Sequence, residues 1–149
     1  MAAVKPIPEG YHSVTPFLVV TGAAKLIDFV KQAFGAHELE RMEGPGGMIA
    51  HAEVKLGDSR VMLSDAGREF SPTTATLYLY VPDADAVYKR AIQAGATSLR
   101  EPTDQFYGDR NAGVRDAFGN QWWIATHKED VSPEELKKRM ASMPQRAAG

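Results

Sequence analysis

Residues 14–35 read VTPFLVVTGAAKLIDFVKQAFG, and this stretch decides the predicted fold. Its first part, residues 14–20, is rich in β-forming residues, and Pro16 suits only the opening or the edge of a strand. Residues 23–34 then carry apolar side chains every three to four positions, and Gly35 follows as a C-terminal stop signal. We therefore predict a strand followed by an amphipathic helix that packs on a sheet.

Three further strands complete the first half of the chain. We predict them at residues 37–42, 48–56 and 60–64, with a hairpin turn at Gly57 and Asp58. The middle strand alternates, so its side chains divide between two faces: Ala50, Ala52, Val54 and Leu56 on one, and His51, Glu53 and Lys55 on the other. The resulting order of elements is β-α-β-β-β.

The second half repeats this order after about 60 residues. We predict a strand at 75–81, a helix at 83–94, strands near 97–100, at 113–116 and at 121–126, and a polar loop at 104–111. Ser132 and Pro133 open a last short helix over about 132–141. The predicted fold class is α+β: one domain over residues 1–149, with modules at about 14–65 and 74–127 whose curved sheets form a cup.

Composition narrows the function classes. The 149 residues include no cysteine, and the formal net charge is −2, which gives no basic surface for a phosphate backbone. No apolar run reaches the roughly 20 residues of a membrane span, and the N-terminus lacks a signal-peptide pattern. We expect a cytoplasmic protein with no nucleic-acid or membrane partner and no thiolate chemistry.

Short motifs in a fixed order support a family resemblance. They are TPFLVV (15–20), FGA (34–36), GDS (57–59), MLSD (62–65), YGDR (107–110), VRDAFGNQW (114–122) and ATHKEDVSPEE (125–135). Over residues 13–141 the chain resembles the vicinal oxygen chelate superfamily of glyoxalases, bleomycin-resistance proteins and extradiol dioxygenases, specifically its PhnB-like branch. The resemblance implies a cup built by two βαβββ modules, and a homodimer, because such proteins commonly pair across a two-fold interface.

The same resemblance predicts where a metal ligand would stand. Catalytic members of the superfamily hold a divalent metal with His or Glu on the first and last strands of each half. These positions correspond here to Thr15, Thr76 and Trp123, with the fourth at Val61 or Met62. Such side chains are poor ligands for a divalent ion, so we predict no metal or other cofactor there. A divalent metal would need a displaced site.

His51 and Glu53 are the best catalytic candidates. They stand two apart on one predicted strand face, which places an imidazole beside a carboxylate, as a general acid and base require. The alternative is structural: this face lies at a rim or in solvent with Lys55, and Glu53 only pairs with a neighbouring base.

The alternation of side chains along the strands and the family resemblance also predict ligand-binding residues that face the cup. They are Thr15, Phe17, Thr76, Tyr78, Tyr80, Gln121 and Trp123, with Val19 and Ala125 beside them. This lining suits a flat or apolar ligand held by stacking, although core packing explains it equally well. Trp122 faces the opposite way and is expected to pack under a helix.

The predicted loop at 104–111 adds three ligand-binding candidates. Phe106 or Tyr107 would reach inward, and Arg110 would meet an anionic ligand. The alternative is that Asp109 and Arg110 merely fix the turn.

Three functions remain open from the sequence. The first is a metal-free binder of an apolar or aromatic small molecule. The second is a glyoxalase-type lyase or isomerase that uses His51 and Glu53, with or without a divalent metal. The third is a structural or regulatory dimer whose own side chains fill the cup.

Overall fold

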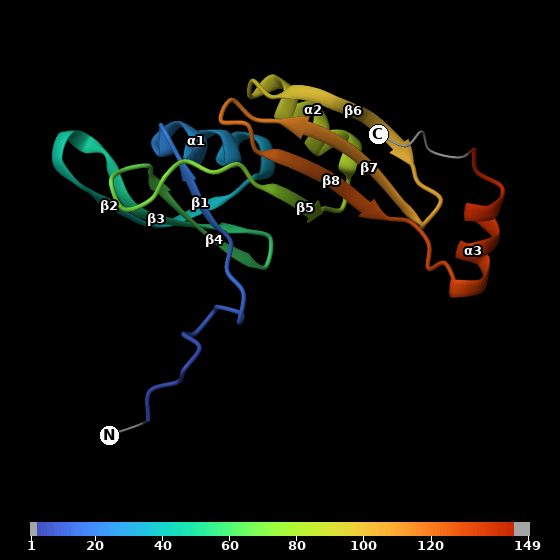
Figure 1. Ribbon diagram of the computed structural model, residues 1–149, viewed down its shortest axis with the longest axis horizontal. Coiled ribbons are helices and arrows are strands. Elements are labelled where there is room, and N and C mark those ends of the chain that lie inside the picture. The colour runs from blue at the N-terminus through green and yellow to red at the C-terminus, as the bar shows by residue number, and fades with distance from the viewer. Residues whose placement is uncertain (1–2, 145–149) are drawn as a thin grey trace.

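The computed structural model describes residues 3–144 and consists of two modules with the same order of elements. The first contains β1 (Phe17–Val20), α1 (Ala23–Phe34), β2 (His37–Glu43), the short 3-10 helix η1 (Pro45–Gly47), β3 (Ile49–Leu56) and β4 (Ser59–Asp65). The second contains β5 (Thr76–Tyr80), α2 (Ala84–Gln93), β6 (Thr97–Asp104), β7 (Asp109–Arg115) and β8 (Gln121–His127), and α3 (Pro133–Ala141) follows (Figure 1). The predicted α+β fold of two βαβββ modules is confirmed.

Each module builds its own four-stranded sheet. The strand orders are β1-β4-β3-β2 and β5-β8-β7-β6, so the first strand of each module pairs in parallel with the last. The other neighbours are antiparallel. Figure 1 shows the two sheets next to one another along the long axis of the molecule. Among residues 3–144 no strand of one sheet pairs with a strand of the other, so the sheets do not close into a barrel.

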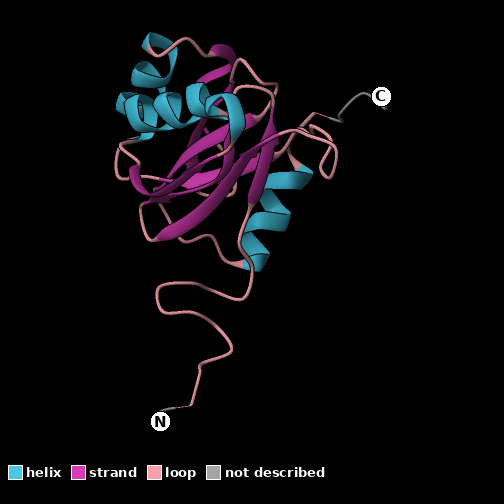
Figure 2. Ribbon diagram, turned by 90° about the vertical axis from the view of Figure 1, so that its left-hand side faces the viewer, coloured by secondary structure: helices cyan, strands magenta, loops and turns pink. Residues whose placement is uncertain are grey.

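Helices α1 and α2 pack together and cover one face of the sheets. Figure 2 shows them on one side of the strands. Leu26, Ile27 and Val30 of α1 are buried in a core that continues into the second module. The ring of Phe34, at the end of α1, lies 4.8 Å from the ring of Trp122 on β8. Trp122 therefore packs under a helix, as predicted. The opposite face of each sheet, called here the open face, is not covered by these helices.

Asp65 ties three segments of the first module together. Its carboxylate accepts hydrogen bonds from the backbone amides of Gly22 and Ala23, both at 2.8 Å, and of Ile49 at 2.7 Å. Two of these amides belong to the start of α1, where the N-cap residue is a glycine and has no side chain to accept them. The carboxylate thereby fixes the helix against the sheet.

Two sequence predictions about strands were wrong. The predicted polar loop at 104–111 is a short turn, because β6 extends to Asp104 and β7 begins at Asp109. Polar residues open β7 without the apolar alternation that marks a strand. In β3 the side chain of Ala50 is exposed and Ile49 is buried instead, because the pairing with β2 shifts register there.

No helix within residues 3–144 combines the length and the apolar character that crossing a membrane would require.

Candidate functional site

The open face of the second sheet carries a buried carboxylate that three side chains share. Asp109 on β7 is 4% exposed. Its Oδ2 accepts hydrogen bonds from the hydroxyls of Tyr78 and Tyr80 on β5, both at 2.8 Å, and its Oδ1 lies 2.8 Å from Nδ1 of His127 at the end of β8. Three strands thus meet at one carboxylate, which holds both tyrosine rings in place.

A second buried polar side chain extends this network along β7. Asn111 is 1% exposed, and its Nδ2 donates to the hydroxyl of Tyr78 at 3.1 Å and to that of Tyr107 at 2.7 Å. Its Oδ1 accepts from Nε2 of Gln105 at 3.1 Å. Each polar atom of this amide therefore has a partner, as burial requires.

The opposite charges of Asp109 and His127 stabilise each other. Burial alone raises the pKa of the Asp109 carboxyl, but hydrogen bonds from His127 and the two tyrosines outweigh it, so this pKa lies below its usual value. The pKa of His127 is raised by its hydrogen bonds to Asp109 and to Asp130, which lies 2.7 Å from its Nε2. Both ring nitrogens face carboxylates, and these contacts favour the protonated form of His127, in which both nitrogens donate.

The tyrosine hydroxyls have a fixed hydrogen-bond polarity. A carboxylate only accepts, so the hydroxyl hydrogens of Tyr78 and Tyr80 both point to Asp109. The rings themselves stay accessible: Tyr78 is 45% and Tyr80 is 59% exposed, and their centroids lie 5.3 Å apart. This arrangement offers aromatic surface together with hydroxyl oxygens that accept hydrogen bonds.

A groove runs along β5 beside these tyrosines. It has a volume of about 560 Å³ and lies between the second module and the β3–β4 turn of the first. Its lining includes Tyr78, Tyr80, Leu56, Asp58, Val87 and Arg90. The volume lies within the range of small-molecule sites.

Trp123 lies beside Tyr78 on the neighbouring strand, but one face of its indole is occupied. The guanidinium of Arg100 lies 4.9 Å from the ring centroid. Gly113 on β7 leaves room for the ring, because a Cβ there would lie 2.6 Å from Trp123 Cζ3. Nε1 of Trp123 donates to Oε1 of Gln121 at 3.3 Å. Trp123 is thus held at the edge of the tyrosine surface.

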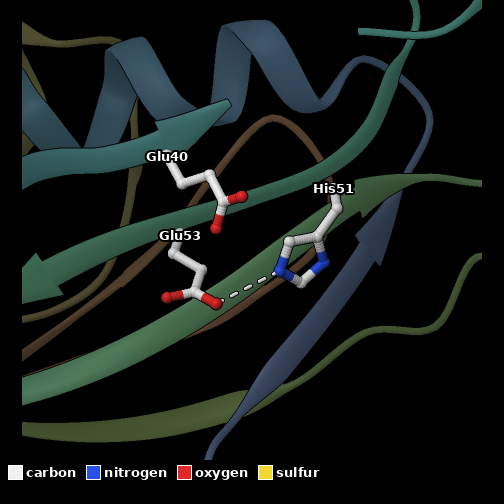
Figure 3. A group of neighbouring side chains, drawn as sticks. All are labelled: Glu40, His51 and Glu53. Carbon is white, nitrogen blue, oxygen red and sulfur yellow. Dashed lines mark hydrogen bonds and ion pairs between the residues drawn. The ribbon is translucent and has the colours of Figure 1, made fainter. Parts of the chain in front are cut away.

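The open face of the first sheet carries a separate group of polar side chains. Nε2 of His51 lies 3.3 Å from Oε1 of Glu53, and Glu40 on β2 points toward both (Figure 3). The hydroxyl of Tyr11 donates to Oε2 of Glu53, and Nη1 of Arg60 lies 3.6 Å from that oxygen. Burial pushes the pKa of Glu53 up, but hydrogen bonds from Tyr11 and His51, with the nearby charges of His51 and Arg60, hold it below its usual value.

The structure divides the predicted site residues into two groups. On the second sheet, Thr76, Tyr78 and Tyr80 lie along β5 opposite Gln121, Trp123 and Ala125 of β8. On the first sheet, Phe17 lies beside His51, with ring centroids 6.1 Å apart, and beside Phe70 at 5.7 Å. Thr15 precedes β1 and is half-buried. Within residues 3–144 no aromatic pair, ion pair or side-chain hydrogen bond joins these two groups.

The candidates from the predicted loop have different positions. Tyr107 joins the network through Asn111, and the ring of Phe106 packs edge-on against it at 5.2 Å. Arg110 lies near α2, where its guanidinium donates to both carboxylate oxygens of Asp85 at 2.7 and 2.9 Å. Successive strand residues alternate in direction, so Arg110 points away from the face that holds Asp109 and Asn111.

Sequence reasoning missed several residues of these groups, and four of them are central. Asp109 and Asn111 were assigned to a loop, His127 lies one residue beyond the predicted strand, and Glu40 lies on a strand with no apolar alternation. No pattern within β7 marks the first two, because the tyrosines that hydrogen-bond them lie on β5, a strand that does not pair with β7.

The duplicated βαβββ architecture and these open faces define the class of protein. The chain belongs to the Glyoxalase/Bleomycin resistance protein/Dioxygenase superfamily, whose family model matches residues 11–124. The predicted superfamily is therefore confirmed.

Several known proteins are similar to this chain in sequence or in fold. The uncharacterized protein Rv0887c of Mycobacterium tuberculosis is 38% identical over 141 residues, which cover 87% of this chain and 83% of that protein. TioX from Micromonospora sp. ML1 superposes with a TM-score of 0.66 at 26% identity, covering 77% of this chain and 99% of TioX. A PhnB protein from Bacillus cereus has a TM-score of 0.61 at 16% identity, with 77% and 99% covered, which shows a shared fold alone.

The metal positions of the superfamily do not fit a metal in this chain. Thr76 offers a hydroxyl and Trp123 an indole, and the indole ring lies against the guanidinium of Arg100. Thr15, with Val61 or Met62, completes the set without an imidazole or a carboxylate. A function that depends on a metal at these four positions therefore has no support in the side chains present.

Proposed function

We propose that this protein binds a flat, apolar or aromatic small molecule along β5, by stacking on Tyr78 and Tyr80. The observation that carries the proposal is a pair of half-exposed rings whose hydroxyls are fixed by one buried carboxylate. A preorganised aromatic surface loses little side-chain entropy on binding. The adjoining groove of about 560 Å³ supplies the volume that such a ligand needs.

The fixed hydroxyls also select the ligand's polar group. Because the hydroxyl hydrogens of Tyr78 and Tyr80 are directed to Asp109 and the Tyr78 oxygen already accepts from Asn111, the Tyr80 oxygen is the acceptor that favours a ligand with a hydrogen-bond donor. A planar molecule with a hydroxyl or an N–H at its edge suits this surface best. It needs no metal at the superfamily's positions.

Calorimetric titration with 2-naphthol tests this function. Tyr80→Leu removes a stacking ring and should weaken binding by up to about tenfold, since an aromatic pair is worth about 0.5–1.5 kcal/mol. The matched control is Tyr88→Leu, because Tyr88 lies on α2 and its hydroxyl donates to Ser98 instead. 2-Methoxynaphthalene lacks the donor and should bind about fivefold more weakly. Equal affinities for wild type and Tyr80→Leu would refute the proposal.

A homodimer is part of the same proposal. The two sheets of one chain stay unclosed, and aromatic side chains such as Phe17 and Tyr80 remain exposed on the open faces. A second copy related by a two-fold axis would cover them and enclose the ligand. Analytical ultracentrifugation should then give twice the 16.3 kDa chain mass. The PhnB-like branch and a cytoplasmic location remain expectations.

An enzyme is the second candidate, favoured by the short distance between His51 and Glu53. With 3.3 Å between Nε2 and Oε1, the pair has the geometry of a general acid and base on a glyoxalase-type lyase or isomerase. The direct assay is turnover of the hemithioacetal of methylglyoxal and glutathione. Loss of that turnover in His51→Ala would support the enzyme, and no turnover by wild type would exclude this reaction.

A further inference from the structure

We propose that Glu40, His51 and Glu53 form a binding site for a divalent transition-metal ion on the open face of the first sheet. The inference goes beyond the proposed ligand binding, which uses the second sheet, and gives His51 and Glu53 a role separate from the acid–base chemistry of the enzyme candidate. It also differs from the superfamily's metal positions, because these three residues lie on β2 and β3.

The strand register brings the three side chains together. Glu40 is the direct partner of Glu53 in the β2–β3 pairing, and His51 lies two residues before Glu53 on the same face of β3. One donor atom from each side chain lies within 4.8 Å of the others (Figure 3). Metal bonds of about 2 Å to nitrogen and oxygen need donors somewhat closer than this, so modest side-chain rotations close the site.

The charges of the two glutamates favour a cation between them. Like charges directly opposite on neighbouring strands repel, and this repulsion costs stability unless something neutralises it. Arg60 approaches Glu53 only at Oε2. Within residues 3–144 Glu40 makes no ion pair and no side-chain hydrogen bond. Apart from the His51 imidazole itself, no cationic side chain within residues 3–144 forms an ion pair with Glu40.

The contacts of the Glu53 carboxylate occupy Oε2 and leave Oε1 available to bind an ion. Tyr11 donates to Oε2, and the guanidinium of Arg60 lies 4.7 Å from the Tyr11 ring, so these two side chains hold that end of the carboxylate. Oε1 is directed to His51. Such outer hydrogen bonds orient metal-binding carboxylates and strengthen the sites that they support. Arg60 lowers the net negative charge, which favours a site that also accepts an anionic or hydroxide ligand.

The donor set defines the class of ion. One imidazole nitrogen and two carboxylate oxygens suit Zn²⁺, Mn²⁺, Co²⁺ or Ni²⁺, whereas the set lacks the thiolates that Cu⁺ prefers. Three protein ligands leave at least one coordination position for water or a small molecule.

The test uses the full chain after treatment with a chelator, titrated with Zn²⁺ in a calorimeter and with Co²⁺ by visible absorption. We expect one ion per chain and cobalt bands characteristic of a nitrogen and oxygen site. His51→Ala should abolish the bands, and Glu40→Gln should weaken Zn²⁺ binding at least tenfold. If Glu53→Gln does not fold, as judged by circular dichroism, the other two variants still carry the test, because their side chains are less buried.

Two control variants distinguish this site from metal binding at other histidines. His37→Ala removes an exposed imidazole on β2 outside the cluster, and His127→Ala removes the imidazole of the second sheet; both should bind Zn²⁺ like wild type. Wild type that takes up no stoichiometric ion, or His51→Ala and Glu40→Gln that bind as wild type does, would overturn the inference. Glu40→Gln should leave 2-naphthol binding unchanged, so failure of the metal site and failure of the proposed function are distinguishable.

Discussion

Replacing Asp109 by asparagine removes the charge at the centre of the second sheet's network while keeping the shape of the side chain. The wild-type carboxylate accepts three hydrogen bonds, from Tyr78, Tyr80 and His127. An amide has one oxygen to accept them, and its NH₂ group faces donors. Hydrogen bonds to charged groups contribute about 1.5–3 kcal/mol each, and a rotated hydroxyl recovers part of the loss. We therefore expect Asp109→Asn to lower the free energy of unfolding by about 2–4 kcal/mol.

The pH dependence makes this prediction specific. The pKa of Asp109 is lowered on folding, so its contribution is present above its unfolded pKa of about 3.9 and is lost as pH falls through the folded value. The pKa of His127 is raised on folding, so its contribution is complete below its unfolded pKa of about 6.5 and is lost as pH rises through the folded value. The difference between wild type and variant should thus be largest from about pH 4 to 6.5.

Urea unfolding followed by tryptophan fluorescence measures both quantities. Asp58→Asn is the matched control, because Asp58 lies in an exposed turn and, among residues 3–144, its carboxylate accepts a hydrogen bond from Ser59 alone. A loss below about 0.5 kcal/mol for Asp109→Asn, or a loss that does not vary with pH, would refute the reasoning about this network.

Other predictions concern the surroundings of the site. Gly113→Ala places a Cβ 2.6 Å from Trp123 Cζ3 and should cost about 1–3 kcal/mol in urea unfolding, whereas Gly67→Ala, with no atom within 4 Å of the new Cβ, should cost less. Arg110→Ala should leave the 2-naphthol affinity unchanged in calorimetry, since its guanidinium is paired with Asp85 away from the open face; a clear loss of affinity would restore the ligand-binding role predicted for it. Tyr107→Phe removes a hydrogen-bond acceptor of Asn111 but keeps the ring, so it should weaken 2-naphthol binding less than Tyr80→Leu does in the same calorimetric titration. The reverse order would mean that stacking on β5 is not the main contact.

The fold was predictable because its signals are local. The helical spacing of residues 23–34, the alternation along β3 and β8, and the repetition of the whole pattern each act over a few residues of chain. The same alternation correctly placed Tyr78, Tyr80 and Trp123 on one face and Trp122 on the other.

The polar part of the site was not predictable for the opposite reason. The burial of Asp109 depends on Tyr78 and Tyr80 of β5 and His127 of β8, and Asn111 also contacts Tyr78; the sequence near β7 carries no sign of these distant partners. Glu40 faces His51 and Glu53 because the β2–β3 ladder shifts register between Glu38 and Glu40. Such irregularities depend on the paired strand, which a pattern within one segment does not reveal.

The indole signals of the two tryptophans give the most direct measurement of ligand binding on the open face. Trp122 is 1% exposed under the helices, whereas Trp123 lies beside Tyr78 on the open face. In a ¹H–¹⁵N spectrum titrated with 2-naphthol, the Trp123 indole signal should shift with saturation while the Trp122 signal stays in place. Saturable calorimetric binding without any shift at Trp123, or no binding by any planar aromatic compound, would contradict the account.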